Sequence, residues 1–304
     1  KKHAMSVNVV EAACNLISNG STYIASSELK NGHCGLLAYL QNVLRYHSGS
    51  ATIVGECWMS ISNLCKDSVE NKEKAMHIGL LEDLHAGICQ HAKYSYNVQA
   101  ACEALWSICN EVDTNKETAG NLGLLEELQS ALQHHAGSTD LLEAACGVLW
   151  CICANVDENK EKAGQLGLLI DLQRVLQQNS FSVEVVVAAL GAVRNVCASV
   201  TSNKEEAKRI NLLADMQAVL RQHRQNADVA VQGCWAVRNA CTDFPSNKEE
   251  ASQLGLLYDM QQVLQQHINS ADVAEAACGA IWSLCSNAAY NKKDMERLQL
   301  MEDV

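Results

Sequence analysis

Apolar residues recur at three- and four-residue steps through most of this chain, which is the spacing of one face of an α-helix. The segment 270–287, SADVAEAACGAIWSLCSN, is typical, because Val273, Ala277 and Ile281 fall on one apolar stripe. Leucines have the same spacing in shorter segments such as 123–135, GLLEELQSALQHH. One proline in 304 residues leaves little to break helices, and aromatic residues at 5% are few for a β-sandwich or barrel. The pattern therefore predicts an all-α protein.

The helical pattern repeats with a constant period. The dipeptide Asn-Lys returns every 44 residues, as from Lys72 to Lys116, and stands at 71–72, 115–116, 159–160, 203–204, 247–248 and 291–292. Two cysteine columns keep the same step, one of Cys65, Cys109, Cys153, Cys197, Cys241 and Cys285, and one, with gaps, of Cys14, Cys102, Cys146, Cys234 and Cys278. Such a period is typical of stacked helical repeats, whose neighbouring units bury a continuous core.

Each unit divides into three expected helices. Asparagine is a favoured N-cap, so we expect helix one to begin at the Asn of each Asn-Lys pair. A residue suited to the left-handed conformation ends that helix eight positions later, in the column Gly35, Gly79, Gly123, Gly167, Asn211 and Gly255. Helix two then closes on His47, His91, His135, Asn179, His223 or His267. A longer helix three follows, and the cysteine columns lie on its buried stripe.

We expect residues 1–304 to form a single repeat domain. Its units are 1–26 (partial), 27–70, 71–114, 115–158, 159–202, 203–246, 247–290 and 291–304 (partial). The unit 27–70 is the least regular, because Ser27 replaces the capping asparagine and Gly32 interrupts helix one. Pro245 is expected in the corner before the Asn247 cap. The chain enters at a third helix near Val9 and stops inside a second, so we expect a segment of a longer protein.

Three features of the repeat match a known family. They are the helix-three string Trp235-Ala236-Val237-Arg238-Asn239, the Asn-Lys pair downstream of it, and the Gly-Leu-Leu entry to helix two. On these residues the whole chain resembles armadillo repeats. The resemblance implies an all-α, right-handed armadillo-type solenoid of about seven three-helix repeats. Many armadillo units have proline near the start of helix two, where this chain has leucine or another residue, so no subfamily is assigned and HEAT-like packing is the alternative.

Composition and charge exclude several classes of protein. A formal charge of −12 and a pI near 5.3 argue against broad binding to nucleic acid or anionic membranes, which depends on clustered Lys and Arg. No apolar run is long enough for a membrane span, and we find no signal peptide. The odd count of fifteen cysteines, many at core positions, indicates reduced thiols in an intracellular protein. We expect a cytoplasmic location, with the nucleus as an alternative.

Candidate catalytic and metal-binding residues were weighed in turn. The chain has no phosphate loop, GxSxG elbow, HExxH motif or dinucleotide fingerprint, so we expect no enzymatic activity and no cofactor. Cys151 and Cys153 point to different helix faces and are expected in the core. Histidines one unit apart are too distant to share a metal ion, so the histidine column is expected to cap helix ends, and no metal site is expected. The column lysines, mostly followed by Glu, are expected to be solvated.

The variable face of helix three has large polar and aromatic residues where the core does not require them. One column changes in register from Trp106 and Trp150 to Arg194 and Arg238, and then to Trp282. The resemblance implies that third helices line a concave surface on which a Trp, followed four residues later by Asn, holds an extended peptide. The residues expected to bind a partner are Asn63, Trp106, Asn110, Trp150, Arg194, Asn195, Trp235, Arg238, Asn239 and Trp282.

Two functions fit these features. The first is a non-enzymatic module that binds an extended or helical segment of a protein partner in the helix-three groove. In it, the arginines would pair with acidic or phosphorylated side chains and the tryptophans would pack on apolar ones. The second is a regulatory or scaffolding segment of a larger signalling, cytoskeletal or ciliary protein. The sequence does not specify the partner or the oligomeric state.

Overall fold

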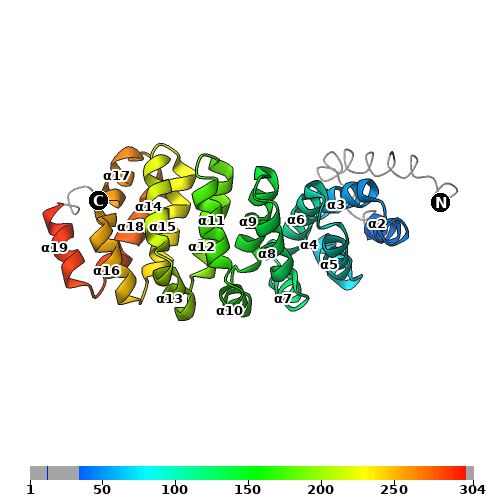
Figure 1. Cartoon of the computed structure of the whole chain (residues 1–304), viewed down its shortest axis with the longest axis horizontal. Helices are drawn as coiled ribbons and strands as arrows, with labels where there is room; N and C mark the ends of the chain where they lie inside the picture. The colour runs from blue at the N-terminus through cyan, green and yellow to red at the C-terminus, as the bar shows by residue number, and fades with distance from the viewer. Residues whose placement is uncertain (1–11, 13–33, 299–304) are drawn as a thin grey trace. The chain divides into compact units, whose positions relative to one another are not determined.

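The computed structural model describes residue 12 and residues 34–298 of the chain, and residues 34–298 form eighteen helices and no strands (Figure 1). The chain divides into two compact units that are larger than a single repeat. The first unit is Lys1–Asn159 and the second unit is Lys160–Val304. Within residues 34–298, none of the helices combines the length and the apolar character that crossing a membrane requires. The irregular features noted at Ser27 and Gly32, the third helix near Val9, Cys14 and the last six residues lie outside the described part.

The helices follow one another in the order expected for each repeat. Helix one is α4 (Val69–His77), α7 (Asp113–Asn121), α10 (Asp157–Gln165), α13 (Thr201–Arg209), α16 (Pro245–Leu254) and α19 (Ala289–Arg297). Helix two is α2 (Cys34–Tyr46), α5 (Leu80–His91), α8 (Leu124–His134), α11 (Leu168–Gln178), α14 (Leu212–Gln222) and α17 (Leu256–Gln266). Helix three is α3 (Ala51–Cys65), α6 (Ser95–Cys109), α9 (Thr139–Ile152), α12 (Val183–Val196), α15 (Ala227–Cys241) and α18 (Ala271–Cys285).

The third helices form the packed centre of each unit. In the first unit α3 packs against α6 and α6 against α9, and in the second α12 packs against α15 and α15 against α18. The described cysteines of both columns are buried, apart from half-buried Cys278, as the periodicity predicts. Burial raises the pKa of Cys102, and likewise of Cys234, to about 12. These thiols are therefore neutral core residues at physiological pH.

The left-handed column after helix one is confirmed except at its first member. Gly79, Gly123, Gly167 and Gly255 have φ between 74° and 93°, and Asn211 has φ 54°. These residues let the chain reverse directly from helix one into helix two. The prediction for Gly35 is wrong, because this residue lies inside α2 and is not a helix terminus.

The prediction that the repeated asparagine is an N-cap is wrong. Helix one begins two residues earlier, so Asn71 is the third residue of α4 and Ser68 caps that helix by accepting from the Asn71 amide. Pro245 likewise is not in a corner but is the first residue of α16, where its missing N–H costs no hydrogen bond. The asparagine does not cap the helix, because its side chain donates hydrogen bonds to backbone carbonyls of the preceding repeat.

The buried asparagine side chain joins each helix one to its neighbours through backbone carbonyls. The Asn203 amide donates to the Val196 carbonyl at 2.7 Å, at the end of the preceding repeat's helix three, and to the Lys160 carbonyl at 2.8 Å, in the preceding repeat's helix one. The same pair of bonds recurs 44 residues away, from Asn247 to the Ala240 and Lys204 carbonyls at 2.8 and 3.1 Å. One amide group thus supplies a donor to a carbonyl at the end of helix three, which helix geometry leaves without a partner, and adds a second bond to a carbonyl inside the preceding repeat's helix one.

The lysine after the asparagine is buried at positions 72, 116, 160, 204 and 248, so the prediction that it is solvated is wrong there, whereas Lys292 is exposed as predicted. Lys204 is 6% exposed, and its ammonium donates to the Thr242 carbonyl at 2.7 Å. Lys248 does the same to the Ser286 carbonyl at 2.7 Å. Both acceptors lie at the C-terminal end of helix three of the lysine's own repeat, where the helix dipole favours a cation. The lysine side chain therefore joins helix one to the end of helix three within a repeat, while the asparagine side chain reaches back to the preceding repeat.

The histidines at the end of helix two also join consecutive repeats. His91 Nε2 lies 2.7 Å from the Ser48 carbonyl and His267 Nε2 lies 3.0 Å from the Arg224 carbonyl. A carbonyl only accepts, so Nε2 carries the proton in these contacts. The histidines are structural, as predicted, but they bond to the preceding repeat and do not merely cap their own helix. We call the Asn and His side chains that bond to the preceding repeat's backbone, together with the Lys side chains that bond to the end of their own repeat's helix three, the inter-repeat seam.

Candidate functional site

The candidate site lies on the variable face of helix three, and its best-defined part belongs to the second unit. Arg194 lies on α12, and Trp235 and Arg238 lie on α15, one helical turn apart. The Arg194 guanidinium carbon is 5.0 Å from the centre of the Trp235 ring, and that of Arg238 is 4.6 Å from it. Both distances are within the range of a cation–π interaction. We call these three residues the Arg–Trp–Arg cluster.

The two arginines of the cluster have no carboxylate partner within the described residues. Most other arginines there do, since ion pairs hold Arg45, Arg174, Arg209, Arg221 and Arg297. Burial, and then the nearby charge of Arg238, lower the pKa of Arg194, but a guanidinium remains charged in proteins. The cluster therefore places two uncompensated positive charges on an otherwise acidic chain.

Neighbouring contacts fix the geometry of the cluster. Arg194 donates to the Gln232 side-chain oxygen at 3.3 Å, and the Arg238 side chain lies against Gly279 of α18. A Cβ atom at Gly279 would be 3.3 Å from Arg238 Nη1, so the glycine leaves room for the guanidinium. Sequence reasoning missed Gln232. Its position one turn before Trp235 on the same helix was the available signal.

Asn239 is close to the cluster, but its side chain already has a backbone partner. Its amide nitrogen donates to the Arg194 carbonyl at 2.8 Å and so ties α15 to α12. Thr242, the C-cap residue of α15, donates to the Arg238 carbonyl and lies 2.9 Å from the Ser283 hydroxyl. Both residues thus fasten third helices together. A role for Asn239 in holding a peptide stays a prediction.

Trp282 is the most exposed residue of the proposed site. Its side chain on α18 is 62% exposed, whereas Ser283 beside it is buried. A large aromatic side chain that is not needed for packing is a common anchor at protein interfaces. The second unit thus offers an aromatic surface on α18, the helix that packs against the α15 of the cluster.

The first unit has a less charged version of the same face. Trp106 on α6 and Trp150 on α9 are each half-buried. Asn63 on α3 is half-buried too, and Asn195 of the second unit has the same intermediate exposure. Asn110 is the C-cap of α6, and its carbonyl accepts from Lys72 at 2.9 Å, so its backbone belongs to the inter-repeat seam.

Cys151 and Cys153, weighed from the sequence as a thiol pair, are both buried. Burial raises the pKa of Cys151 to about 11, although the Lys116 and Lys72 ammonium groups lower it. The two residues lie at the end of the packed α9, where their prediction as core positions is confirmed.

Comparison with known proteins supports the fold. No family model matches the chain, and no curated protein matches it. A designed armadillo repeat protein in complex with the peptide (KR)4 superposes with TM-score 0.68 and 19% identity, covering 85% of this chain and 100% of that one. Computationally designed armadillo repeat proteins for modular peptide recognition give TM-score 0.69 and 20% identity over 80% of this chain and 98% of theirs.

A natural system is also similar. A structure concerned with a phosphorylation switch in the interaction between cadherin and beta-catenin gives TM-score 0.70 and 16% identity. The match covers 99% of this chain and 62% of that one. At these identities the similarity establishes architecture only. The chain is therefore an all-α protein with an armadillo-like fold.

Proposed function

We propose that the chain is a non-enzymatic protein-interaction module whose second unit binds an acidic or phosphorylated segment of a partner protein on the helix-three face. The observation that carries this proposal is the Arg–Trp–Arg cluster. Its two guanidinium groups lack carboxylate partners within residues 34–298, while Trp235 keeps them in place. A carboxylate or phosphate would supply the missing partner through a charge-assisted hydrogen bond.

The charge of the proposed partner differs from that of the peptide bound by one similar structure. The designed armadillo protein binds (KR)4, a basic peptide. In the present chain the residues at the centre of the face are Arg194 and Arg238, which would repel a basic peptide. An acidic segment would instead be attracted to a positive patch, and the attraction would weaken as salt screens it.

The tryptophans supply the apolar part of the proposed contact. Trp282 in the second unit would pack against an apolar side chain of the bound segment. Trp106 and Trp150 give the first unit a corresponding aromatic surface for a separate stretch of partner. Aromatic and arginine side chains dominate the energetics of protein interfaces, so these residues are expected to contribute most of the binding energy.

Fluorescence anisotropy with labelled peptides tests the proposal. Three peptides of equal length are compared: one rich in Glu, the same peptide with phosphoserine, and one rich in Lys. We expect binding of the first two and none of the third. The R194E/R238E variant is expected to lose at least about tenfold in affinity, which corresponds to roughly 1.4 kcal/mol.

A charge-matched variant controls for net charge. Arg209 and Arg224 are exposed and belong to helix one and to the corner after helix two, away from the cluster. R209E/R224E changes the formal charge by the same amount and is expected to retain wild-type affinity. Equal affinity of wild type and R194E/R238E for the acidic peptides, or equal loss in both double variants, would contradict the proposed site.

A further inference from the structure

Helix two carries a repeated polar contact between consecutive repeats. A glutamine in one repeat donates to an aspartate in the next, as from Gln41 to Asp83 at 2.7 Å and from Gln173 to Asp215 at 2.6 Å. A second side chain, one turn further on, bonds to the same carboxylate: Arg45 to Asp83 at 2.9 Å, for example. These positions therefore form a set of three side chains, two on one helix two and a carboxylate on the next.

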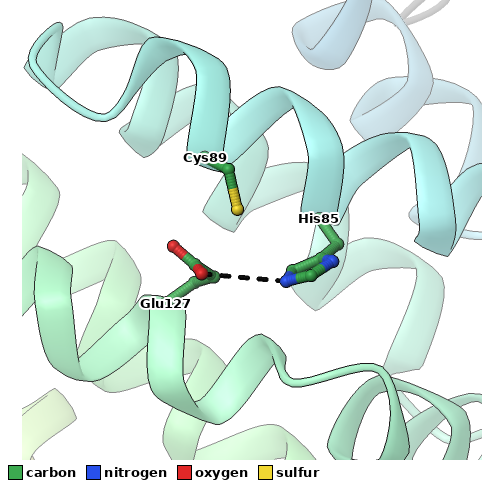
Figure 2. A group of neighbouring side chains, drawn as sticks. All are labelled: His85, Cys89 and Glu127. Carbon is green, nitrogen blue, oxygen red and sulfur yellow. Dashed lines mark ion pairs between the residues drawn. The ribbon is translucent and has the colours of Figure 1, made fainter.

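At the junction between α5 and α8, all three positions of this set hold different residue types. On α5 the first two positions are His85 and Cys89, and on α8 the carboxylate is Glu127 (Figure 2). Figure 2 shows the three side chains pointing toward one another across the gap between the two helices. Their potential ligand atoms all lie within 4.8 Å of one another. The described part of the chain holds this one group of three His, Cys, Asp or Glu side chains with such spacing.

The side chains in this group are close enough for a small rearrangement to give a coordination site. His85 Nε2 and Glu127 Oε1 are 3.7 Å apart, which is longer than a hydrogen bond, and the Cys89 thiol hydrogen-bonds to the Glu127 carboxylate. Zinc binds histidine nitrogen at about 2.0–2.1 Å and carboxylate oxygen at about 2.0–2.2 Å, so two such ligands on a tetrahedral ion lie roughly 3.4 Å apart. A small side-chain rotation would bring all three ligand atoms to that separation.

We propose that His85, Cys89 and Glu127 form a binding site for a zinc-like divalent transition-metal ion that links α5 to α8. Imidazole nitrogen, thiolate sulfur and carboxylate oxygen are the three ligand types that zinc uses, and a thiolate disfavours Mg²⁺ and Ca²⁺. Binding requires the Cys89 thiol to release its proton, after which thiolate and carboxylate balance the charge of the ion. Water would occupy the fourth position.

The surroundings leave the ion accessible. Cys89 is the exposed cysteine among those whose side chains the structure describes, and His85 and Glu127 are half-exposed. Glu127 also lines a hollow of about 570 Å³ together with Ser130 and His134 of α8. An ion can therefore enter from solvent, and a fourth ligand can reach it from that hollow. The other cysteines described are wholly or largely buried and do not compete for the ion.

The sequence signal for this site is a change in three columns at once. Each change alone is unremarkable. His85 stands where the preceding repeat has Gln41, and Glu127 stands where it has Asp83. The expectation of no metal site rested on the Cys151 and Cys153 pair and on the histidine column. The signal at this site is different: a His-Cys pair one turn apart on one helix, with a carboxylate 38 residues after the cysteine in the next repeat.

Zinc titration of the reduced full-length chain tests the site. Isothermal titration calorimetry should give one zinc ion per chain for the wild type. The matched variant is H85Q/C89Q/E127D, which installs the side chains that the chain itself has at Gln173, Gln177 and Asp215. We expect this variant to fold, as judged by its circular dichroism, and to bind zinc at least about 100-fold more weakly, because loss of even an outer contact to a metal ligand costs about 10–100-fold.

Cobalt supplies a second readout that identifies the ligands. A Co²⁺ complex of the wild type should show a thiolate charge-transfer band in the near ultraviolet, and C89S should abolish it. Zinc should raise the unfolding temperature of the wild type and not of H85Q/C89Q/E127D. Equal zinc affinity of wild type and triple variant, or a charge-transfer band that survives in C89S, would overturn the assignment.

Discussion

The inter-repeat seam and the helix-three face use the same 44-residue period in opposite ways. In the seam the same residue types return in each repeat, and their side chains bond to backbone carbonyls, as Asn203 does to Lys160 and Val196. On the helix-three face the residue type changes from tryptophan to arginine in one column. The Asn203 and Lys204 side chains of the seam are buried, whereas Trp282 on the face is 62% exposed.

The difference follows from the chemistry of the partner atoms. A backbone carbonyl is present in every repeat whatever its sequence, so one solution serves all repeats and there is no reason to vary it. A surface that contacts another molecule must match that molecule's side chains, which differ from one position to the next. Repetition in a solenoid therefore indicates stability, and variation at a repeated position indicates recognition.

The largest effect is expected from raising the pH, because the seam surrounds a thiol-rich core. The pKa of Cys65, Cys102, Cys197 and Cys234 is raised by burial to about 12, against roughly 8.5 in an unfolded chain. The folded state then holds protons that the unfolded state releases. Stability is complete below pH 8.5 and falls above it, by about 1.4 kcal/mol per pH unit for each thiol.

Urea denaturation at several pH values between 7 and 10, in reducing buffer, measures this loss. The C102A/C234A variant should be less stable at pH 7 but should lose stability with pH less steeply, by roughly 3 kcal/mol per pH unit for the two thiols removed. The same slope in wild type and variant would show that these thiols do not control the alkaline transition.

The next largest effect should come from the seam itself. Asn203→Ala leaves the Val196 carbonyl at the end of α12 without this donor and removes a second bond to the Lys160 carbonyl, so we expect a loss of about 1–3 kcal/mol in the free energy of unfolding. Ser202→Ala, at the exposed neighbouring position, is the control and should change stability by less than about 0.5 kcal/mol. Denaturant titration gives both values. A loss at Asn203 no larger than at Ser202 would remove the asparagine from the seam.

A histidine of the seam should contribute less than an asparagine. His267→Ala removes one bond to the Arg224 carbonyl from a half-exposed position, and we expect a cost of about 1 kcal/mol. His134 is exposed and bonds only within its own helix, to Ser130, so His134→Ala should cost no more than a few tenths of a kcal/mol. Comparison of the two unfolding midpoints separates bonds between repeats from bonds within one helix.

The smallest stability change is expected on the helix-three face. Trp282→Ala should alter the free energy of unfolding by less than about 0.5 kcal/mol, because most of the side chain is already in water. If the face is a recognition surface, the same substitution should weaken the acidic-peptide complex measured by anisotropy. A large loss of stability would instead assign Trp282 to packing and would weaken the contrast between the two regions.

The sequence was sufficient for the fold because the period constrains every helix at once. The Cys153 column marked the buried stripe, and the positive-φ column from Gly79 to Gly255 marked the start of helix two. The start of helix one was misplaced because asparagine has two possible uses. N-cap preference is a local property, whereas the bond from Asn115 to the Lys72 carbonyl depends on a residue 43 positions away.

Long-range contacts also explain what was missed at the candidate sites. The change from Trp150 to Arg194 was visible in the sequence, but the pairing of Arg194 with Trp235 depends on how closely α12 approaches α15. In the same way the glutamate following Lys204 gave no indication that this lysine reaches Thr242. Side-chain contacts between helices can be identified only when the distance between those helices is known.

The backbone acceptors of the seam have a consequence for how such a chain can change. Asn203 bonds to carbonyls of the preceding repeat, which no substitution removes, so a 44-residue block carries its own fastening to whatever repeat precedes it. Duplication, deletion or exchange of whole blocks within a unit should therefore keep the register of hydrogen bonds intact. Block rearrangement would then give a lineage new orders of tryptophan and arginine without the need to evolve a new interface between repeats.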